Sequence, residues 1–216
     1  EYVMEQLQKH FNDYTLVGEE SYDKSQGFTH KKAIYIDPID GTTNFVHGIP
    51  HLGVSLGVWE DGVPTLAVVY NPILNELFYA AKGEGAYLNE TKLHVSGQTQ
   101  LQQSLIGTGF PYAKVNKGIE HDWVLKTMTN LLANIRDIRR LGAAAIDLCY
   151  LAQGKIDAFY EIDLQPWDVS AGILLVLEAG GKVSNARGEK FSMESKSIVV
   201  SNAKVHDALL KYIETI

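Results

Sequence analysis

Two short apolar runs near the start of the chain are each followed at once by acidic residues. Residues 15–17 lead into Gly18-Glu19-Glu20-Ser21, and residues 33–36 lead into Asp37-Pro38-Ile39-Asp40. Proline fixes φ and has no N–H, so the chain is predicted to turn sharply as it leaves this second, buried strand, which lets the two aspartates converge. Converged carboxylates repel one another, and a hard divalent cation such as Mg²⁺ is the usual neutraliser. The pattern indicates a metal site; aspartates that only cap a turn, and a solvated pair of glutamates, are the alternatives.

The next three residues, Gly41-Thr42-Thr43, add groups that bind anions. Glycine lets the backbone approach a ligand closely, and threonines at the start of a helix offer N–H and hydroxyl groups where an anion is favoured. A cation held beside such donors would suit a phosphate, because it lets an acidic protein bind an acidic ligand.

A third acidic segment, Gln165-Pro166-Trp167-Asp168-Val169-Ser170-Ala171-Gly172, opens an apolar helix that is predicted to run to Glu178. Asp168 in the first turn is stabilised by the helix dipole whether or not it binds a ligand, so capping is the alternative interpretation. The small residues that follow Trp167 indicate tight packing, which would hold the carboxylate rigidly.

Strands and helices that could position these segments alternate along the chain. The apolar pattern predicts a helix over residues 2–11, then a meander of strands over 52–59, 65–70 and 76–81, with a hairpin turn at 83–85. The second half is predicted to have strands at 104–108, 135–138, 156–160, 182–184 and 197–200, and helices at 122–133, 143–152, 167–178 and 203–213. This order predicts a mixed α/β protein whose first sheet is antiparallel and whose second is mixed. Residues 1–100 and 101–216 are predicted as two parts of one functional unit.

Composition narrows the range of partners. The 216 residues include 19 Lys and Arg against 26 Asp and Glu, a formal net charge of −7. Scattered basic residues argue against a nucleic-acid partner, and the apolar runs are too short to span a membrane, so a cytoplasmic protein is expected. The single cysteine, Cys149, lies in an apolar run and is predicted to pack in the core. His47 and His51 flank the aspartate segment and are left out of the predicted site.

The three acidic segments, in this order and at these separations, resemble the inositol monophosphatase family of Mg²⁺-dependent, lithium-sensitive phosphatases. The resemblance runs from about Glu1 to the C-terminus, and Asn44-Phe45-Val46-His47 is similar to the inositol branch. It implies an α/β layered sandwich of the α+β type, with alternating helix and sheet layers, that forms a homodimer. The implied activity is hydrolysis of inositol monophosphate, or of a similar small polyol or sugar phosphate, without a covalent intermediate. Fructose 1,6-bisphosphate, a nucleotide 3′-phosphate and NADP are alternative substrates, and a weakly catalytic metal- or phosphate-binding protein is the alternative function.

The resemblance also implies roles for individual residues. Glu19, Asp37 and the carbonyl of Ile39 are implied as ligands of one Mg²⁺, and Asp37, Asp40 and Asp168 as ligands of a second, with a third, weaker ion beside Glu19. The N–H groups of Gly41 and Thr42 are implied as phosphate contacts, and the Thr42 hydroxyl, grouped with Glu19 and Asp40 as catalytic, as a partner of the attacking water. Gly142, Ala143, Ala144, Glu161 and Asp168 are implied as contacts of the substrate ring.

Family members also carry a helical segment ahead of the first glutamate, with an aspartate that helps to position the attacking water. We expect either that such a segment lies upstream of Glu1 or that the 216 residues turn substrate over poorly.

Overall fold

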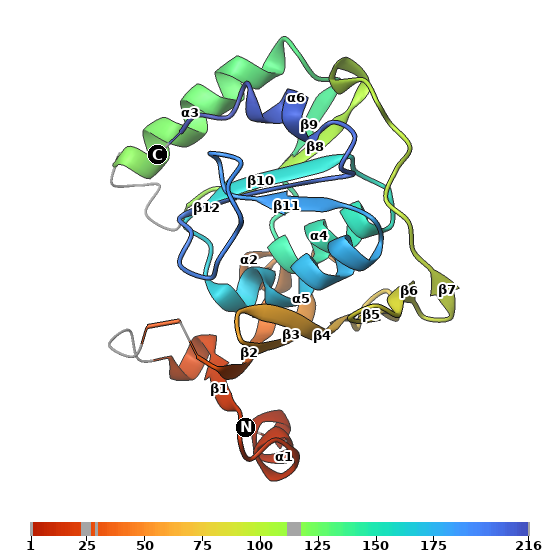
Figure 1. The fold of residues 1–216 in the computed structure, drawn as a ribbon, viewed down its shortest axis with the longest axis vertical. Helices are drawn as coiled ribbons and strands as arrows, with labels where there is room; N and C mark the ends of the chain where they lie inside the picture. The colour runs from red at the N-terminus through yellow and green to blue at the C-terminus, as the bar shows by residue number, and fades with distance from the viewer. Residues whose placement is uncertain (1, 23–26, 29, 112–117, 216) are drawn as a thin grey trace.

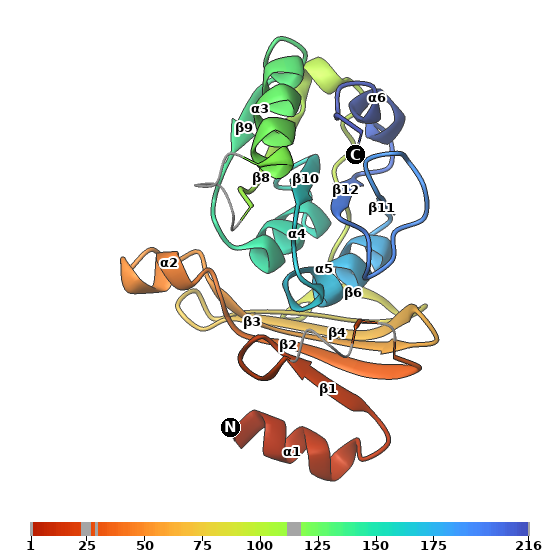
Figure 2. The ribbon, with the colours of Figure 1, turned by 90° about the vertical axis from the view of Figure 1, so that its left-hand side faces the viewer.

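The computed structural model describes residues 2–22, 27–28, 30–111 and 118–215. In this part of the chain two sheets and six helices are stacked in alternating layers (Figure 1). The helices are α1 (Tyr2–His10), α2 (Thr42–Val46), α3 (Ile119–Leu132), α4 (Ala144–Ala152), α5 (Pro166–Glu178) and α6 (His206–Leu210). From one end to the other the layers are α1, the first sheet, α4 with α5, the second sheet, and α3 with α6 (Figure 2). The predicted layered sandwich is confirmed.

The first sheet has seven strands in sequence order. They are β1 (Thr15–Gly18), β2 (Lys32–Asp40), β3 (Gly53–Glu60), β4 (Val63–Asn71), β5 (Glu76–Ala81), β6 (Gly85–Leu88) and β7 (Thr91–Lys92). All neighbours are antiparallel except β1 and β2, which are parallel. The prediction of an antiparallel first sheet is therefore wrong for β1. Parallel pairing needs a long crossover, and residues 19–31 provide the chain length for it.

The second sheet has the order β11-β12-β10-β8-β9 and is mixed, as predicted. Its strands are β8 (Leu105–Thr108), β9 (Asp137–Arg139), β10 (Ala158–Ile162), β11 (Lys182–Ser184) and β12 (Ser197–Ser201). β8 lies parallel to β9 and to β10, whereas β12 is antiparallel to both of its neighbours. All five residues of β10 and of β12 are buried, because helices cover both faces of the sheet's centre.

The middle layer carries most of the core. α5 is buried from Pro166 to Val176, and α4 is buried along nearly its whole length. Both helices lack a polar face because a sheet covers them on either side. Cys149 of α4 is a free, fully buried thiol, which confirms its predicted role in packing.

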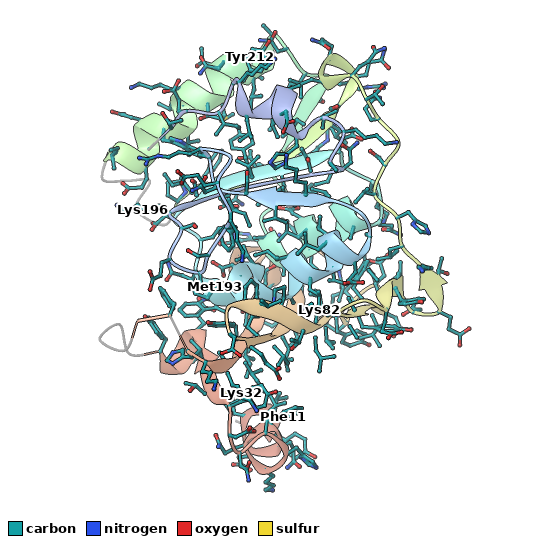
Figure 3. The ribbon with its side chains drawn as sticks, in the orientation of Figure 1. Phe11, Lys32, Lys82, Met193, Lys196 and Tyr212 are labelled. Atoms are coloured by element: carbon teal, nitrogen blue, oxygen red, sulfur yellow. The ribbon has the colours of Figure 1, made fainter. Side chains whose placement is uncertain are left out.

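The outer helix α1 is less buried than the helices of the middle layer. α1 has no buried residue and rests on the first sheet through Leu7, and through Phe11 just beyond its end. Figure 3 places Phe11 at one end of the molecule and Tyr212, beside α3, at the other. No helix in the described residues is long and apolar enough to cross a membrane.

Two local predictions are corrected by the structure. The chain does not turn at Pro38; β2 continues through Asp40, with a register shift between Asp37 and Asp40. Proline, which cannot donate a ladder hydrogen bond, is tolerated at such a bulge. The last helix is α6, much shorter than the predicted 203–213, and it does not begin at Ala203 because that residue has φ +67 and stands outside the helical region.

Candidate functional site

Three buried aspartates converge at the point where β2 ends and α5 begins. Asp37 and Asp40 lie on β2, and Asp168 lies in the first turn of α5. One carboxylate oxygen from each lies within 4.8 Å of the others. The three residues are 2%, 6% and 3% exposed. The structure thus brings together the three carboxylates that the sequence predicted as ligands of one ion.

Burial shifts the protonation of this cluster strongly. Burial, reinforced by the nearby Glu19 carboxylate, raises the pKa of Asp37 to about 7. Burial raises the pKa of Asp168 to about 8, although the N–H of Gln165 opposes the shift. The pKa of Asp40 is raised well above its ordinary value by burial and by the charges of Asp37 and Asp168. The charged cluster is therefore unfavourable by itself, and a bound cation would relieve the repulsion.

The bulge in β2 is what makes Asp37 and Asp40 converge. Asp37 pairs with Ser55 and Asp40 with Gly53, so β2 carries one more residue than β3 across this interval. In a regular strand, residues three apart face opposite sides of the sheet, and the extra residue returns Asp40 to the side of Asp37. The Ile39 N–H donates to Oδ1 of Asp37 at 2.9 Å, which fixes that carboxylate.

Asp168 both caps α5 and belongs to the cluster. Its Oδ2 accepts a 2.7 Å hydrogen bond from the Gln165 N–H, as expected for a capping box. A carboxylate has two oxygens and about four acceptor sites, so capping leaves capacity for a cation. The geometry confirms the capping interpretation, and the role of Asp168 as a metal ligand stays a prediction.

Glu19 approaches the aspartates from β1. It opens the short 3₁₀ turn Glu19–Ser21 directly after that strand, is half-buried, and interacts electrostatically with Asp37. Because β1 runs parallel to β2, the strands bring Glu19 and the aspartates to the same edge of the sheet. Burial and the neighbouring Glu20 raise the pKa of Glu19. Glu20 itself is exposed, in line with a solvated side chain.

Every residue predicted for the site lines one cleft, of about 830 Å³ with its open mouth included. The complete lining is Glu19, Asp37, Ile39, Asp40, Gly41, Thr42, Thr43, Gly109, Phe110, Arg140, Gly142, Ala143, Ala144, Asp147, Glu161, Leu164 and Asp168. The lining joins the end of β2 and the start of α2 to the start of α4, over about 100 residues of sequence.

The close approach of these segments depends on Gly41. Its φ is +85, and a Cβ there would lie 2.9 Å from Cβ of Ala143 and 3.0 Å from the His51 carbonyl. A side chain would therefore be strained and would also push the two segments apart. The next residue, Thr42, is exposed, and its hydroxyl donates to the Ile39 carbonyl at 3.1 Å.

Glu161 occupies space that a glycine leaves open. A Cβ on Gly109 would lie 2.0 Å from Oε1 of Glu161, so only glycine lets the carboxylate sit over the end of β8. Burial raises the pKa of Glu161 well above its ordinary value, with further contributions from Asp147 and Asp168. Glu161 is the carboxylate expected to contact the substrate ring.

Several cleft residues and two supporting residues were missed in the sequence. Asp147 is 2% exposed, and its Oδ1 lies 3.0 Å from Nε2 of His51. This contact makes His51 a supporting residue that holds the Asp147 carboxylate in place. Burial raises the pKa of Asp147 even though His51 opposes the shift. A lone acid in the apolar helix α4 was a usable signal for it. Arg140, from the Arg pair just before Gly142, was another, whereas nothing local marks Gly109 or Phe110.

Asn44 is the other supporting residue. This buried side chain donates from Nδ2 to the His51 carbonyl at 2.6 Å and to the Leu141 carbonyl at 2.9 Å. It thereby links the first turn of α2 to the segment that precedes Gly142.

The cluster fits a hard divalent cation. Its donors are carboxylates and the Ile39 carbonyl, which are the oxygen ligands that Mg²⁺ takes, and no sulfur or imidazole ligand joins the cluster among the described residues. Aspartates with raised pKa values and no basic partner among the described residues near them need a cation to be charged together.

Comparisons with known proteins agree on one relationship. The model of the inositol monophosphatase family matches residues 1–216. The chain is similar to inositol monophosphatase 1 of Solanum lycopersicum, with 37% identity over 98% of this chain and 78% of that protein. It is similar to Nus factor SuhB of Pasteurella multocida, with 38% identity over 99% and 79% of the two chains. The crystal structure of the extragenic suppressor protein suhB from Bartonella henselae superposes with a TM-score of 0.88, at 36% identity, over 99% of this chain and 82% of that one.

Proposed function

The chain belongs to the inositol monophosphatase family, and we propose that it is a Mg²⁺-dependent phosphomonoesterase that hydrolyses inositol monophosphate or a similar small polyol or sugar phosphate. The observation that carries this proposal is the position of the aspartate cluster. Asp37, Asp40 and Asp168 share one cleft with the Gly41-Thr42 backbone on one side and the Gly142-Ala143-Ala144 segment on another. Such a cleft can hold a phosphate between cations and N–H donors while its ester group contacts the opposite wall.

Two metal ions would be held by the carboxylates. Glu19, Asp37 and the Ile39 carbonyl would hold one, and Asp37, Asp40 and Asp168 the other, with a weaker third ion beside Glu19. When bound, such ions neutralise the phosphate, lower the pKa of water and stabilise the leaving oxygen. Because Asp37 belongs to both sets, its position between Glu19 and the other two aspartates supports this arrangement.

The chain's own residues would orient the attacking water and accept its proton. The Thr42 hydroxyl donates to the Ile39 carbonyl, so its oxygen remains free to accept a hydrogen bond from water. Glu19, half-buried in the same cleft, would accept the proton. Asp40 completes the proposed catalytic group by holding its metal ion.

The remaining wall of the cleft would bind the alcohol part of the ester. Glu161 and Asp147 could accept hydrogen bonds from hydroxyl groups, and the small side chains of Ala143 and Ala144 leave room for a ring. This set favours a compact polyol. The phosphate itself would be bound by the N–H groups of Gly41 and Thr42.

Assembly as a homodimer is part of the proposal. α2 and the loop after it expose Phe45, Val46 and Ile49, which are 55%, 74% and 46% accessible. Grouped apolar side chains at a surface commonly mark a contact with another protein. A second copy placed there would lie close to the mouth of the cleft, since Thr42 and Thr43 of α2 line it.

A second candidate is a protein that keeps the site but turns over slowly. It is supported by the Pasteurella multocida relative, whose name, Nus factor SuhB, is not that of a hydrolase. For such a protein, binding of Mg²⁺ and phosphate would persist while hydrolysis would be weak.

One assay separates the two candidates. Release of inorganic phosphate would be measured with Mg²⁺ and with EDTA on inositol 1-phosphate, fructose 1,6-bisphosphate, a nucleotide 3′-phosphate and NADP. Mg²⁺-dependent release that is fastest from inositol 1-phosphate is expected. Binding of Mg²⁺ without release from any of the four esters would favour the second candidate. Release that is unaffected by EDTA would contradict both.

A further inference from the structure

The proposed substrate cleft contains one cationic side chain among many acidic ones. In the described part of the chain, Arg140 is the one basic residue that lines it, against six Asp and Glu side chains. Arg140 lies between β9 and Gly142, at the wall that would bind the alcohol part of the ester. A cation at this place is not needed by the metal cluster.

Two contacts place the Arg140 side chain over the cleft. Its Cζ lies 5.3 Å from the centre of the Phe110 ring, a cation–π arrangement that holds the flat group against the aromatic face. Its Nη1 crosses Gly142 so closely that a Cβ on that glycine would lie 2.5 Å away. Because φ of Gly142 is also +96, glycine is required there for the backbone and for the passage of the arginine.

The donors of Arg140 have no partner in the part of the chain that the structure describes. Guanidinium has five N–H groups, and among the described residues none of them makes a hydrogen bond or an ion pair. The adjacent Arg139 differs, since its Nη1 lies 2.5 Å from Oδ2 of Asp137 and 2.8 Å from the Ile138 carbonyl. Arg139 also lines a different surface hollow, with Arg136 and Lys155.

Electrostatics place Arg140 on the side of the leaving group. Burial raises the pKa of Asp147 and of Glu161, and the charge of Arg140 partly opposes both shifts. The two carboxylates suit hydroxyl groups of a substrate. The guanidinium, flat and fully charged, suits a phosphate or carboxylate, which it can bind through two parallel hydrogen bonds.

We propose that Arg140, held by Phe110 and Gly142, is a specificity residue that binds a second anionic group on the leaving-group side of the substrate. The proposal rests on the proposed phosphomonoesterase function and adds to its substrates a class of phosphate esters whose alcohol part carries another phosphate or carboxylate. The scissile phosphate would be bound at the aspartate cluster, and the second anion at Arg140.

The test uses two esters that differ only in the second phosphate. kcat/KM with Mg²⁺ would be measured for fructose 1,6-bisphosphate and for fructose 1-phosphate, in the parent and in Arg140→Gln, which removes the charge at similar length. Arg139→Gln is the matched control. It removes the same charge from the neighbouring residue, whose side chain contacts Asp137 and lines a different hollow. Affinity for both compounds would also be measured by calorimetry with Ca²⁺ in place of Mg²⁺.

The parent is expected to prefer the bisphosphate in both measurements. Arg140→Gln is expected to lower this preference about 10- to 100-fold, the usual value of hydrogen bonds to a charged group. Arg140→Lys should restore part of the preference, since it returns the charge without the two parallel hydrogen bonds of a guanidinium. Arg139→Gln should retain the whole preference.

The failure of each proposal has its own signature. A parent that binds and hydrolyses both sugars equally, or an Arg140→Gln variant whose preference stays within about threefold of the parent, would overturn the role of Arg140 and leave the phosphatase intact. If the parent releases phosphate from no ester, the proposed function fails, and calorimetry alone still decides whether Arg140 binds the second phosphate.

Discussion

The backbone N–H of Ala145 donates a 2.8 Å hydrogen bond to Oδ2 of Asp40, although the two residues are 105 positions apart. The bond joins the last residue of β2 to the first turn of α4. It fixes one oxygen of a cluster aspartate relative to the Ala143-Ala144 wall, so the proposed metal and substrate subsites would be held at a fixed distance from each other. The rigidity of this link rests on the buried packing of α4 beneath it.

Removal of one cluster carboxylate should abolish turnover without unfolding the protein. Asp37→Asn and Asp168→Asn keep the shape of the side chain but remove a charged ligand. Because changes beyond the ligands themselves already cost about 10- to 100-fold, each variant should lose more than about 100-fold in kcat. Phosphate release and circular dichroism would be measured together, with Asp122→Asn on the exposed face of α3 as control. Activity within about threefold of the parent in both variants would contradict the metal assignment.

Mg²⁺ should stabilise the folded protein. Ions that bind only the native state add RT ln(1 + [L]/Kd), about 2.7 kcal/mol at a hundredfold excess over Kd. Titration with Mg²⁺ or Mn²⁺ should therefore raise Tm, and Asp40→Asn should reduce the rise. A Tm that does not move across the titration would argue against a metal site.

Without metal, the protein should lose stability as pH rises from about 6.5 to 8. The folded-state pKa of Asp37 is about 7 and that of Asp168 about 8, both above the ordinary value of 3.8. In this range the native state binds more protons than the unfolded state, so the free energy of unfolding falls with pH, by about 0.5 kcal/mol per pH unit for Asp37 and about 1 kcal/mol per pH unit for Asp168. Urea unfolding in EDTA at both pH values measures the loss. Asp168→Asn should make it smaller, and saturating Mg²⁺ should remove it; an equal loss in all three samples would refute ionisation of the buried aspartates as its cause.

His206 should make the protein sensitive to acid. Its ring is fully buried, with Nε2 2.9 Å from the Ser184 hydroxyl and Nδ1 2.9 Å from the Ser201 hydroxyl. Burial lowers its pKa to about 4, so from about pH 6.5 down to 4 the unfolded state takes up a proton first and stability falls. His206→Gln should lack this component, worth about 2 to 3 kcal/mol between pH 6.5 and 4. Urea unfolding at both pH values would show it, and the exposed His10→Gln variant should behave like the parent.

A methyl group on Gly109 should displace the carboxylate of Glu161, a residue far away in the sequence. In Gly109→Ala the new Cβ would occupy the place of the Glu161 carboxylate, which must move away from the cleft. We expect kcat/KM to fall about tenfold or more, since small displacements of positioning groups are costly. Gly97→Ala is the matched control, because neither glycine has a positive φ and a Cβ on Gly97 would lie 3.9 Å from its nearest neighbour, Nζ of Lys204. Equal activity in the two variants would contradict the role assigned to Gly109.

The acidic segments and the layered fold could be predicted from the sequence because their signals are local. Asp37 and Asp40 stand a few residues apart after an apolar run, and Asp168 opens an apolar helix, so residue type and spacing already indicate a cation site. Alternation of strand and helix predicted the second sheet in the same way. The short motif around Glu19 also marks this residue in the sequence. Its closeness to Asp37 depends on the pairing of β1 with β2, which the motif does not reveal.

What only the tertiary structure decided involves residues far apart in the chain. The bulge at Pro38 replaced a predicted turn because pairing with β3, not the proline alone, determines how β2 continues. Arg140 meets Phe110, and Glu161 meets Gly109, through the side-by-side pairing of β8 with β9 and β10, which periodicity in one segment cannot encode. Local sequence specifies which side chains are available and on which element they lie. The long-range packing of the two sheets around α4 and α5 determines which of them share a cleft, because burial and close approach depend on the whole chain at once.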